Sequence, residues 1–383
     1  MAGPRWYKLF FLVLVSVAAF PSPPVHPAQA AFAVDERKPS SAAVKPASLA
    51  ALWHDPGEIP SLDLTFGQGG KERAPHNDAI YSFVKEDLGG TSTKFYVKDQ
   101  DGVEWLVKVG DEARGETAAT RFVWAMGYFV DEDYFVPAMR VAGLLKLHRK
   151  SHSIHKDGTI TNARLKRTEN SQKKLNTWAW TDNPFLGSRE LNGLRVLMAV
   201  MNNWDLKTVN NKVYGPMQGK EETASVAREE QVSDPEAHPG DGGAGPVADP
   251  DREGAGVRYV VSDLGASFGR TGGVSSRSKG KVKDYAKDPF IRATARETVD
   301  FVMRTKPAGI LRIFKPGYYR ERTAMADTVR NIPRADAKWI GSQLARLTPE
   351  QIRSAFQAAG FTREEVDGYL AEWNKRIAEL NAL

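Results

Sequence analysis

The chain contains 383 residues, of which 41% are hydrophobic and 10% aromatic, so it can bury a sizeable core in one two-lobed domain or in two domains. Its formal net charge of +6 is modest and its basic residues are not gathered in one tract, which predicts solubility and argues against a nucleic-acid partner. The absence of cysteine excludes a disulfide scaffold, a cysteine-ligated metal site, a thiol nucleophile and lipid attachment at cysteine.

The first 30 residues have the pattern of a signal peptide. Arg5 and Lys8 precede an apolar run over residues 9–20, and the small-x-small sequence AQA ends at Ala30. The apolar run is short for a bilayer span, and an uncleaved anchor is the alternative. We therefore expect cleavage near Ala30 and export to the periplasm or the medium, with no transmembrane segment in the mature protein.

The N-terminal part after the signal is predicted to be rich in strands. Residues 31–60 are rich in Ala, Pro and Ser without periodicity, which indicates a flexible linker. From Ile80 onward, strand-forming residues alternate around glycine-containing turns. This pattern predicts three strands, over residues 80–86, 94–99 and 103–109.

A helix and further strands follow. Residues 111–127 carry acids early and a glycine at the end, which predicts a helix, and residues 134–147 predict one or two strands. We assign no element to the polar, basic residues 148–176. Residues 187–203 place Leu and Met along one face behind Ser188, which predicts a strong helix with Ser188 as its N-cap.

The remainder is predicted to contain an insertion and then mostly helices. Residues 217–256 hold ten acids, three bases and no Leu, Ile or aromatic residue, which predicts a disordered insertion. A short strand is expected over 258–262, and the chain beyond Thr298 has a helical pattern. Two capping boxes, at residues 348–351 and 362–365, predict the starts of two terminal helices. The fold class is therefore α+β.

Two motifs in the strand-rich part suit contact with phosphates. LGGTSTK, residues 88–94, combines glycines that allow close backbone approach with hydroxyl donors. Lys108 lies between valines on a predicted strand, where an ammonium group needs a phosphate or a carboxylate as partner. Glu116 on the following helix is the expected partner, and Glu112 is the competing candidate. Taken singly, a plain turn and a solvent-facing lysine would explain these motifs.

Two further motifs carry acids and amides. In WDLKTVN, Asp205 can accept a proton, Lys207 can neutralise a phosphoryl group, and Asn210 can hold a metal through its amide oxygen. Asn211 is adjacent, and only the spacing favours Asn210. In SDLG, Asp263 follows a strand and suits a divalent cation that bridges phosphates, although Asp-x-Gly is also common in hairpins.

In this order the motifs resemble those of the protein-kinase-like superfamily over about residues 80–270. DLKTVN resembles the catalytic loop, SDLG the Asp-Phe-Gly motif, WLVKVG the lysine strand and LGGTSTKFYV the glycine-rich loop. The resemblance implies a two-lobed kinase-like fold, with a strand-rich N-lobe over 61–147 and a mostly helical C-lobe over 148–383. Trp204 stands where the family has arginine, and neither the full glycine motif nor Ala-Pro-Glu is present. The chain is thus more similar to the atypical branch, which includes HipA-type, phosphatidylinositol and secretory-pathway kinases.

The resemblance implies an exported phosphotransferase that uses ATP and Mg²⁺ to phosphorylate an unidentified hydroxyl acceptor. The residues it implies are Gly89, Gly90 and Lys94 over the phosphates, Lys108 and Glu116 at the nucleotide, Asp205 and Lys207 in catalysis, and Asn210 and Asp263 at magnesium. A kinase-fold binding or scaffolding module is the alternative, and transfer of AMP is a second possible chemistry. A Ser-His-Asp hydrolase is disfavoured because the sequence has no G-x-S-x-G.

Overall fold

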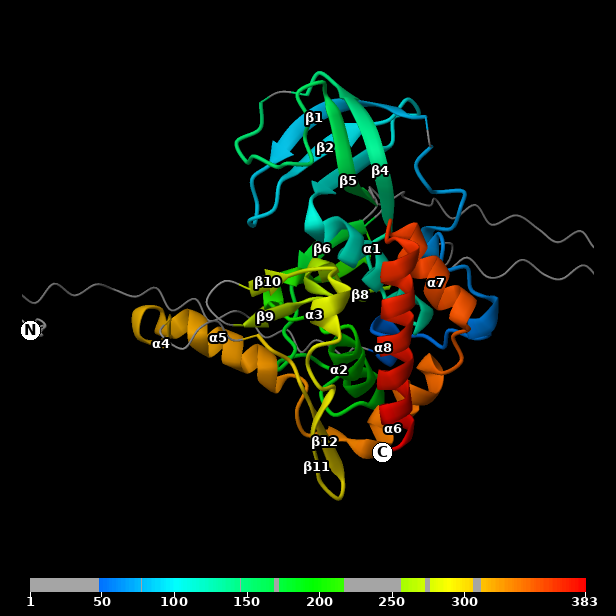
Figure 1. The fold of residues 1–383 in the computed structure, drawn as a ribbon, viewed down its shortest axis with the longest axis vertical. Helices are drawn as coiled ribbons and strands as arrows, with labels where there is room; N and C mark the ends of the chain where they lie inside the picture. The colour runs from blue at the N-terminus through cyan, green and yellow to red at the C-terminus, as the bar shows by residue number, and fades with distance from the viewer. Residues whose placement is uncertain are drawn as a thin grey trace, which may run out of the picture. The chain divides into compact units, whose positions relative to one another are not determined.

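The computed structural model describes residues 48–383 except 77, 145, 169–171, 217–255, 273–275 and 306–310. The chain divides into two units, Met1–Lys45 and Pro46–Leu383, and all described residues belong to the second. The predicted signal peptide and nearly all of the predicted insertion over 217–256 lie outside the described residues. Strands and helices both contribute to the second unit, so the α+β class is confirmed (Figure 1).

Five strands close into a small barrel in the order β1-β2-β3-β5-β4 (Figure 1). Their bounds are β1 (Ile80–Asp87), β2 (Lys94–Lys98), β3 (Glu104–Val109), β4 (Asp133–Ala142) and β5 (Thr159–Arg167). Only the pairing of β1 with β4 is parallel among these neighbours. The three strands predicted over residues 80–109 are confirmed to within one residue at each end.

Alternation along the strands gives the barrel wall two faces. The inner face is apolar and buried, with Phe95, Val97, Trp105, Val107 and Leu165. The opposite face of the same strands carries Lys94, Tyr96, Leu106, Lys108, Arg164 and Lys166. Lys108 is in register with Lys94 on one side and with Arg164 on the other, so these three cationic residues form one row across the wall.

Strand β5 lies within residues 148–176, to which the sequence analysis assigned no element. Its apolar residues, such as Ala163 and Leu165, fill the barrel, while Arg164 and Lys166 face the other way. The two basic residues interrupt the apolar pattern and so conceal a strand whose outer face contacts other parts of the protein instead of water.

Two helices at the centre of the unit match their predictions. α1 (Asp111–Ala125) follows β3, and Gly115 within it allows close approach of the Ser267 carbonyl oxygen, which would lie 3.2 Å from an added Cβ. α2 (Arg189–Val200) begins behind Ser188, whose Oγ accepts a hydrogen bond from the Leu191 amide at 3.1 Å. Both helices are buried on most sides, which fixes the residues that leave their ends.

Short strands frame the two acidic motifs. β6 (Gln172–Asn176), β7 (Asn211–Pro216) and β8 (Arg258–Val261) form an antiparallel sheet in the order β6-β7-β8. The motif that contains Asp205 leads into β7, and Asp263 follows β8. The predicted strand over 258–262 is thus confirmed, and the pairing of β7 with β8 brings the two acidic motifs to neighbouring strand ends.

The prediction that the chain is helical beyond Thr298 is correct only in part. From this residue onward, β12 (Thr298–Phe301) and β13 (Ile332–Pro333) form a sheet with the preceding β11 (Ile291–Thr294). Earlier in the chain, β9 (Arg270–Gly272) pairs with β10 (Ser276–Ser278). The remaining helices are α3 (Val282–Tyr285), α4 (Leu311–Phe314), α5 (Pro316–Asp327), α6 (Arg334–Leu344), α7 (Pro349–Ala358) and α8 (Arg363–Asn381), and the 3₁₀ turns are η1 (Leu49–Ala51), η2 (Ile59–Ser61), η3 (Gly67–Gly69), η4 (Thr208–Asn210) and η5 (Leu264–Ala266). Both predicted capping boxes are present at the starts of α7 and α8.

An aromatic cluster attaches α1 to the C-terminal helices. The Phe122 ring stacks on Trp373 with centroids 4.1 Å apart, and Phe356 stacks on Tyr369 at 4.5 Å. Phe268 contacts the rings of Phe122 and Phe356 edge-on. Burial of these large side chains holds α1 between the barrel and α7 and α8, so the acids on α1 occupy fixed positions.

The predicted linker over residues 31–60 is wrong for its described end. Residues 48–60 include two 3₁₀ turns, and Leu52 and Ile59 are fully buried in the main core. The Ala- and Pro-rich composition concealed these few apolar anchors. Among the residues that the structure describes, none of the helices combines the length and the apolar character that a bilayer crossing requires.

Candidate functional site

Lys108 is the centre of an ion cluster drawn from three separate segments. Its Nζ lies 2.8 Å from Glu116 Oε2, 3.1 Å from Glu112 Oε2 and 2.5 Å from Asp263 Oδ1, and only 4% of its side chain is exposed. Burial alone would lower the pKa of Lys108, but the three carboxylates raise it above its ordinary value. The two glutamates that the sequence left as alternatives therefore both contact the lysine.

A second cation reaches each glutamate. Arg164 Nη2 lies 3.1 Å from Glu116 Oε1, and Lys279 Nζ contacts Glu112 Oε1. Burial alone would raise the pKa of Glu112, but the ammonium groups of Lys108 and Lys279 hold it at about 2. With Asp263, these contacts join three acids to three bases, and Arg164 also contacts the buried carboxylate of Asp133 at 3.6 Å.

Asp263 adopts a backbone conformation that non-glycine residues rarely use. Its φ is 53° and its ψ is 53°, and such left-handed residues are frequent at functional sites. A Cβ added to Gly265 would lie 2.9 Å from Glu112 Cβ, so the glycine of SDLG lets this segment approach α1. About half of the Asp263 side chain is exposed, and Oδ2 makes no hydrogen bond or ion pair with the described residues.

The glycine loop between β1 and β2 lies against the same cluster. Ser92 Oγ donates a hydrogen bond to Glu112 Oε2 at 2.8 Å. Arg149 donates to the carbonyl oxygens of Gly89 and Ser92, both at 3.1 Å, which fixes the loop from outside. Gly90 has a φ of 63°, a conformation that glycine adopts without strain. The loop thus contacts Glu112 through Ser92, whereas the neighbours of Gly89 and Gly90 include Lys94.

Asp205 belongs to a second charged group. Its Oδ2 lies 2.8 Å from Lys207 Nζ, and its Oδ1 forms an ion pair with Arg322 from α5. Arg322 is only 2% exposed, and its Nε donates to the Thr305 carbonyl oxygen at 2.9 Å. Asn210 Nδ2 donates to the Asp205 carbonyl oxygen at 2.8 Å. The loop therefore presents a carboxylate whose two oxygens both have cationic partners.

The two adjacent asparagines have different environments. Asn211 is 1% exposed, and its Nδ2 donates to the Trp178 carbonyl oxygen at 3.2 Å inside the protein. Asn210 is half-buried, and its side-chain oxygen accepts no hydrogen bond from the described residues. Asn210 is consequently the better placed of the two to offer an oxygen to a ligand.

Trp204 connects the two charged groups. The Arg322 guanidinium lies 5.3 Å from the centroid of the Trp204 ring, and Lys279 Nζ lies 5.7 Å from it. Arg322 is the partner of Asp205, while Lys279 is the partner of Glu112. The two groups therefore share one indole ring, although no interaction among the described residues joins Asp205 directly to the Lys108 cluster.

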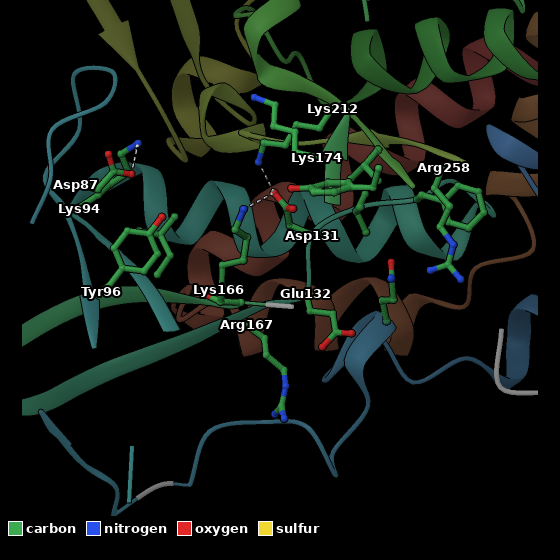
Figure 2. Close-up of a pocket in the computed structure, with 17 residues that line it drawn as sticks. Asp87, Lys94, Tyr96, Asp131, Glu132, Lys166, Arg167, Lys174, Lys212 and Arg258 are labelled. Atoms are coloured by element: carbon green, nitrogen blue, oxygen red, sulfur yellow. Dashed lines mark ion pairs between the residues drawn. The ribbon is translucent and has the colours of Figure 1, made fainter. Parts of the chain in front are cut away.

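A cavity of about 480 Å³ adjoins the row of cations on the barrel wall (Figure 2). It lies between the outer face of β2, β3 and β5 and strands β6, β7 and β8, and its basic lining residues are Lys94, Lys166, Arg167, Lys174, Lys212 and Arg258. Lys94 pairs here with Asp87 at 3.3 Å and does not join the Lys108 cluster. Its predicted role over the phosphates stays a prediction, and its partner in the structure is an acid of β1.

Three charged residues of these groups were missed by the sequence analysis. Arg164 carries the same signal as Lys108, a charge between apolar residues on a strand, and could have been found by the same argument. Lys279 belongs to a basic run over residues 270–287, a composition typical of a solvated loop and not of a buried contact. Nothing in the local sequence of Arg322 indicates that its side chain is buried beside Asp205.

Comparisons with protein-family models, with curated proteins and with solved structures found no match to this chain. Within the described residues, no group of three or more His, Cys, Asp or Glu side chains is arranged to hold a metal ion, and this includes the histidines of residues 148–155. The function must therefore be argued from the site itself.

Proposed function

We propose that this protein is a kinase-like phosphotransferase that moves the γ-phosphoryl group of ATP to a hydroxyl acceptor with the help of Mg²⁺. One observation carries the proposal: Lys108 Nζ contacts Glu116 and Asp263 at the same time. Protein kinases use a lysine on the third strand, a glutamate on the following helix and an aspartate of an Asp-x-Gly motif. Here Lys108 is on β3, Glu116 is on α1, and Asp263 follows β8.

The order of elements supports a two-lobed kinase-like arrangement. The barrel and α1 carry the glycine loop, the lysine and the glutamate, whereas the mostly helical part carries Asp205, Asn210 and Asp263. The lysine strand comes before the catalytic loop, which comes before the Asp-x-Gly motif, as in kinases. The pairing of β7 with β8 accounts for the approach of the two motifs, whose aspartates, Asp205 and Asp263, are 58 residues apart in the chain.

The donor types of Asp263 and Asn210 support the proposal of magnesium as the cofactor. Mg²⁺ in phosphoryl-transfer sites is usually held by one or two carboxylates together with substrate phosphates. Asp263 offers a half-exposed carboxylate and Asn210 offers an amide oxygen without a partner among the described residues. When bound there, Mg²⁺ would supply positive charge that neutralises the phosphates. Lys108 would contact the phosphates of ATP from the barrel side, ordered by Glu116.

Asp205 is the proposed base that accepts the proton of the attacking hydroxyl. Its two cationic partners differ in freedom, because Lys207 is 35% exposed whereas Arg322 is 2% exposed. We infer that Arg322 keeps the carboxylate in position. Lys207 would leave Oδ2 for the transferring phosphoryl group, which frees that oxygen to take the proton.

A binding or scaffolding module is the second candidate. The observation that favours it is the saturation of the site, since Lys108 already contacts three carboxylates and both Asp205 oxygens contact cations. A site of this kind can hold a ligand without turnover. Export, which we also propose from the pattern of residues 1–30, favours this candidate because nucleotide triphosphates are scarce outside the cytoplasm. N-terminal sequencing of protein from the culture medium or periplasm tests export.

The deciding experiment measures binding of ATP with and without Mg²⁺ by calorimetry, and turnover as ADP release. Asp263→Asn should weaken Mg²⁺-dependent binding about tenfold or more, and Asp205→Asn should keep binding but lower turnover about a hundredfold. Asp101→Asn is the matched control, because Asp101 is exposed in the turn between β2 and β3.

Binding of ATP by the unaltered protein with turnover that neither variant changes would favour the binding module. Failure of the unaltered protein to bind ATP under any metal condition would refute the proposed phosphotransferase.

A further inference from the structure

We propose that the cavity in Figure 2 is a binding site for a phosphate-bearing small molecule, anchored by Lys166 and Lys212. The proposal rests on the charges and the shape of this cavity. It does not depend on the phosphoryl transfer proposed above, because a site of this kind can serve a binding module equally well.

The anchor contains two lysines that share one carboxylate. Asp131 Oδ2 lies 3.3 Å from Lys166 Nζ and 3.7 Å from Lys212 Nζ, and Figure 2 shows it between them. The exposed fractions of the side chains are 11% for Asp131, 16% for Lys166 and 20% for Lys212. Asp131 neutralises one ammonium group, and the other acid that acts on Lys166, Asp133, already contacts Arg164 at 3.6 Å, so one positive charge of the trio is only partly compensated in a largely buried place. Such a charge is costly unless a further anion arrives.

Of the two lysines, Lys212 is the one whose charged form is destabilised. Burial lowers its pKa to about 8, and the attraction of Asp131 offsets this only in part because Lys166 lies closer to the carboxylate and repels Lys212. An anion beside Lys212 would replace the missing counter-charge. The site therefore gains most from a ligand that carries negative charge at neutral pH.

The rest of the lining adds to the positive excess. Six basic residues line the cavity, against three acids, and five still outnumber the acids when Arg258, which has a partner of its own, is set aside. The other two acids already have partners, since Asp87 pairs with Lys94 at 3.3 Å and Glu132 pairs with Arg73 at 2.9 Å. Lys174 on β6 is paired with Tyr214 of β7, two residues from Lys212, so the two lysines lie on the same face of this sheet. Lys174 therefore adds to the positive charge on the side of the cavity that carries Lys212.

The size of the cavity and its uncharged lining residues indicate a ligand larger than a phosphate ion. About 480 Å³ is within the range of small-molecule sites. Tyr96, Leu106, Tyr214 and Val260 supply aromatic and apolar surface within the same cavity. The chemistry that fits is a phosphate or polyphosphate joined to a flat or apolar organic group.

Two sources can supply this ligand. Leu106 of β3 is paired with Lys166 of β5, and Lys108 is paired with Arg164 two residues further along β3. The Leu106–Lys166 pair therefore lies roughly 7 Å from the Lys108–Arg164 pair along the strands. The phosphates of a donor nucleotide can therefore lie in the cavity next to the Lys108 cluster. A second phosphorylated molecule, bound beside the donor, is the other source.

The test uses pyrophosphate in the presence of EDTA as the probe, with calorimetry on the full chain at low salt. Lys212→Met and Lys166→Met should each weaken binding about tenfold or more, and Lys212→Arg should restore most of it. Lys338→Met makes the same charge change on the exposed surface of α6 and should have no effect. Circular dichroism identifies any variant that fails to fold. If Lys212→Met fails to fold, Lys212→Arg still tests the proposal, because it keeps the charge and should therefore retain binding of pyrophosphate.

Equal affinity of pyrophosphate for Lys212→Met, Lys166→Met and Lys338→Met would overturn the proposal, as would the absence of binding to the unaltered protein. Competition between pyrophosphate and ATP would assign the site to the donor, whereas simultaneous binding would assign it to a second ligand. Binding of pyrophosphate in EDTA is measured without Mg²⁺, ATP or turnover, so failure of the phosphotransferase proposal and failure of this one give different results.

Discussion

Replacing Lys108 by methionine tests the ion cluster without reference to any activity. The change keeps most of the side-chain length and removes an ammonium group that is 4% exposed and contacts three carboxylates. Glu116 keeps Arg164 at 3.1 Å, Glu112 keeps Lys279, and the half-exposed Asp263 regains water. Each of the three carboxylates therefore keeps a cation or water as a partner when the lysine is lost.

The remaining contacts of the three acids set the expected loss in the free energy of unfolding. Removing one partner of a buried ion pair typically costs about 3 to 5 kcal/mol, and the remaining cations place Lys108→Met at the lower end, about 3 kcal/mol at pH 7. The cost should shrink in acid, because protonation of the carboxylates removes the charges that the variant leaves without a partner. The variant should thus differ from the unaltered protein more at pH 7 than at pH 3.

Glu112 gives this pH dependence its direction. Burial alone would raise its pKa, but Lys108 and Lys279 lower it from 4.5 to about 2. This difference is worth about 3 kcal/mol of stability, which is present above pH 4.5 and is lost as the pH falls towards 2. Lys108→Met gives up the share due to Lys108, so its free energy of unfolding should decline less steeply between pH 5 and pH 2.

Urea denaturation followed by tryptophan fluorescence at pH 7, 5 and 3 measures these differences, with Lys338→Met as the matched control. A loss below about 1 kcal/mol at pH 7 would show that the lysine contributes little to holding the cluster together. A loss that stays constant from pH 7 to pH 3 would contradict the assignment of that cost to unpaired carboxylates.

Three further changes test other contacts. Arg322→Met should lower ADP release about tenfold or more while leaving ATP affinity within about twofold, because it removes the buried partner that positions Asp205. Thr348→Ala should lower the free energy of unfolding in urea by about 1 kcal/mol, because it removes the N-cap of α7. Gly269→Ala should lower the melting temperature and cost about 3 kcal/mol, since its Cβ would lie 2.0 Å from the Ser278 carbonyl oxygen.

Each of the three has a simple control. Arg322→Lys keeps the charge and should retain more activity than the methionine variant, and equal losses would contradict a positioning role through charge. Thr348→Ser keeps the capping hydroxyl and should be nearly neutral. Gly317→Ala meets no atom within 4 Å and should not destabilise; a loss as large as that of Gly269→Ala would show that the contact with Ser278 is not the cause.

The parts of the fold that were predictable are those in which one short segment carries the whole signal. The alternation over residues 80–109 predicted three strands to within a residue, because the inner face of each strand is apolar and the turns contain glycine. Ser188 and the two capping boxes predicted helix starts because a cap is a contact between residues three apart. The contact of Lys108 with a glutamate was predictable for a similar reason, since strand β3 runs directly into α1.

The parts that were missed depend on contacts between distant segments. β5 was overlooked because the partners of Arg164 lie on α1 and β4, so its charge is satisfied inside the protein and not by water. Residues 48–60 were taken for a linker because a composition rich in Ala and Pro does not show that Leu52 and Ile59 are buried in one core with residues of distant helices. The sheet that contains β12 and β13 was missed because its strands are four and two residues long.

The tryptophan before Asp205 is explained only by the structure. The resembled family has arginine at this position, and here the cation comes from Arg322, 117 residues from Asp205 in the chain. The Trp204 ring lies beside that guanidinium, with a centroid distance of 5.3 Å, and is 3% exposed. We infer that Trp204 and Arg322 act on Asp205 as one unit, because the ring supplies the surface against which the guanidinium is held.

A double-mutant cycle tests this unit. Trp204→Leu should release Arg322 from its position and lower ADP release, and adding Arg322→Met should cause little further loss, because both changes remove the same support of Asp205. Unfolding in urea identifies any loss that comes from destabilisation alone. If the two losses multiply in the double variant, Trp204 fills space in the core and has no part in positioning Asp205 through Arg322.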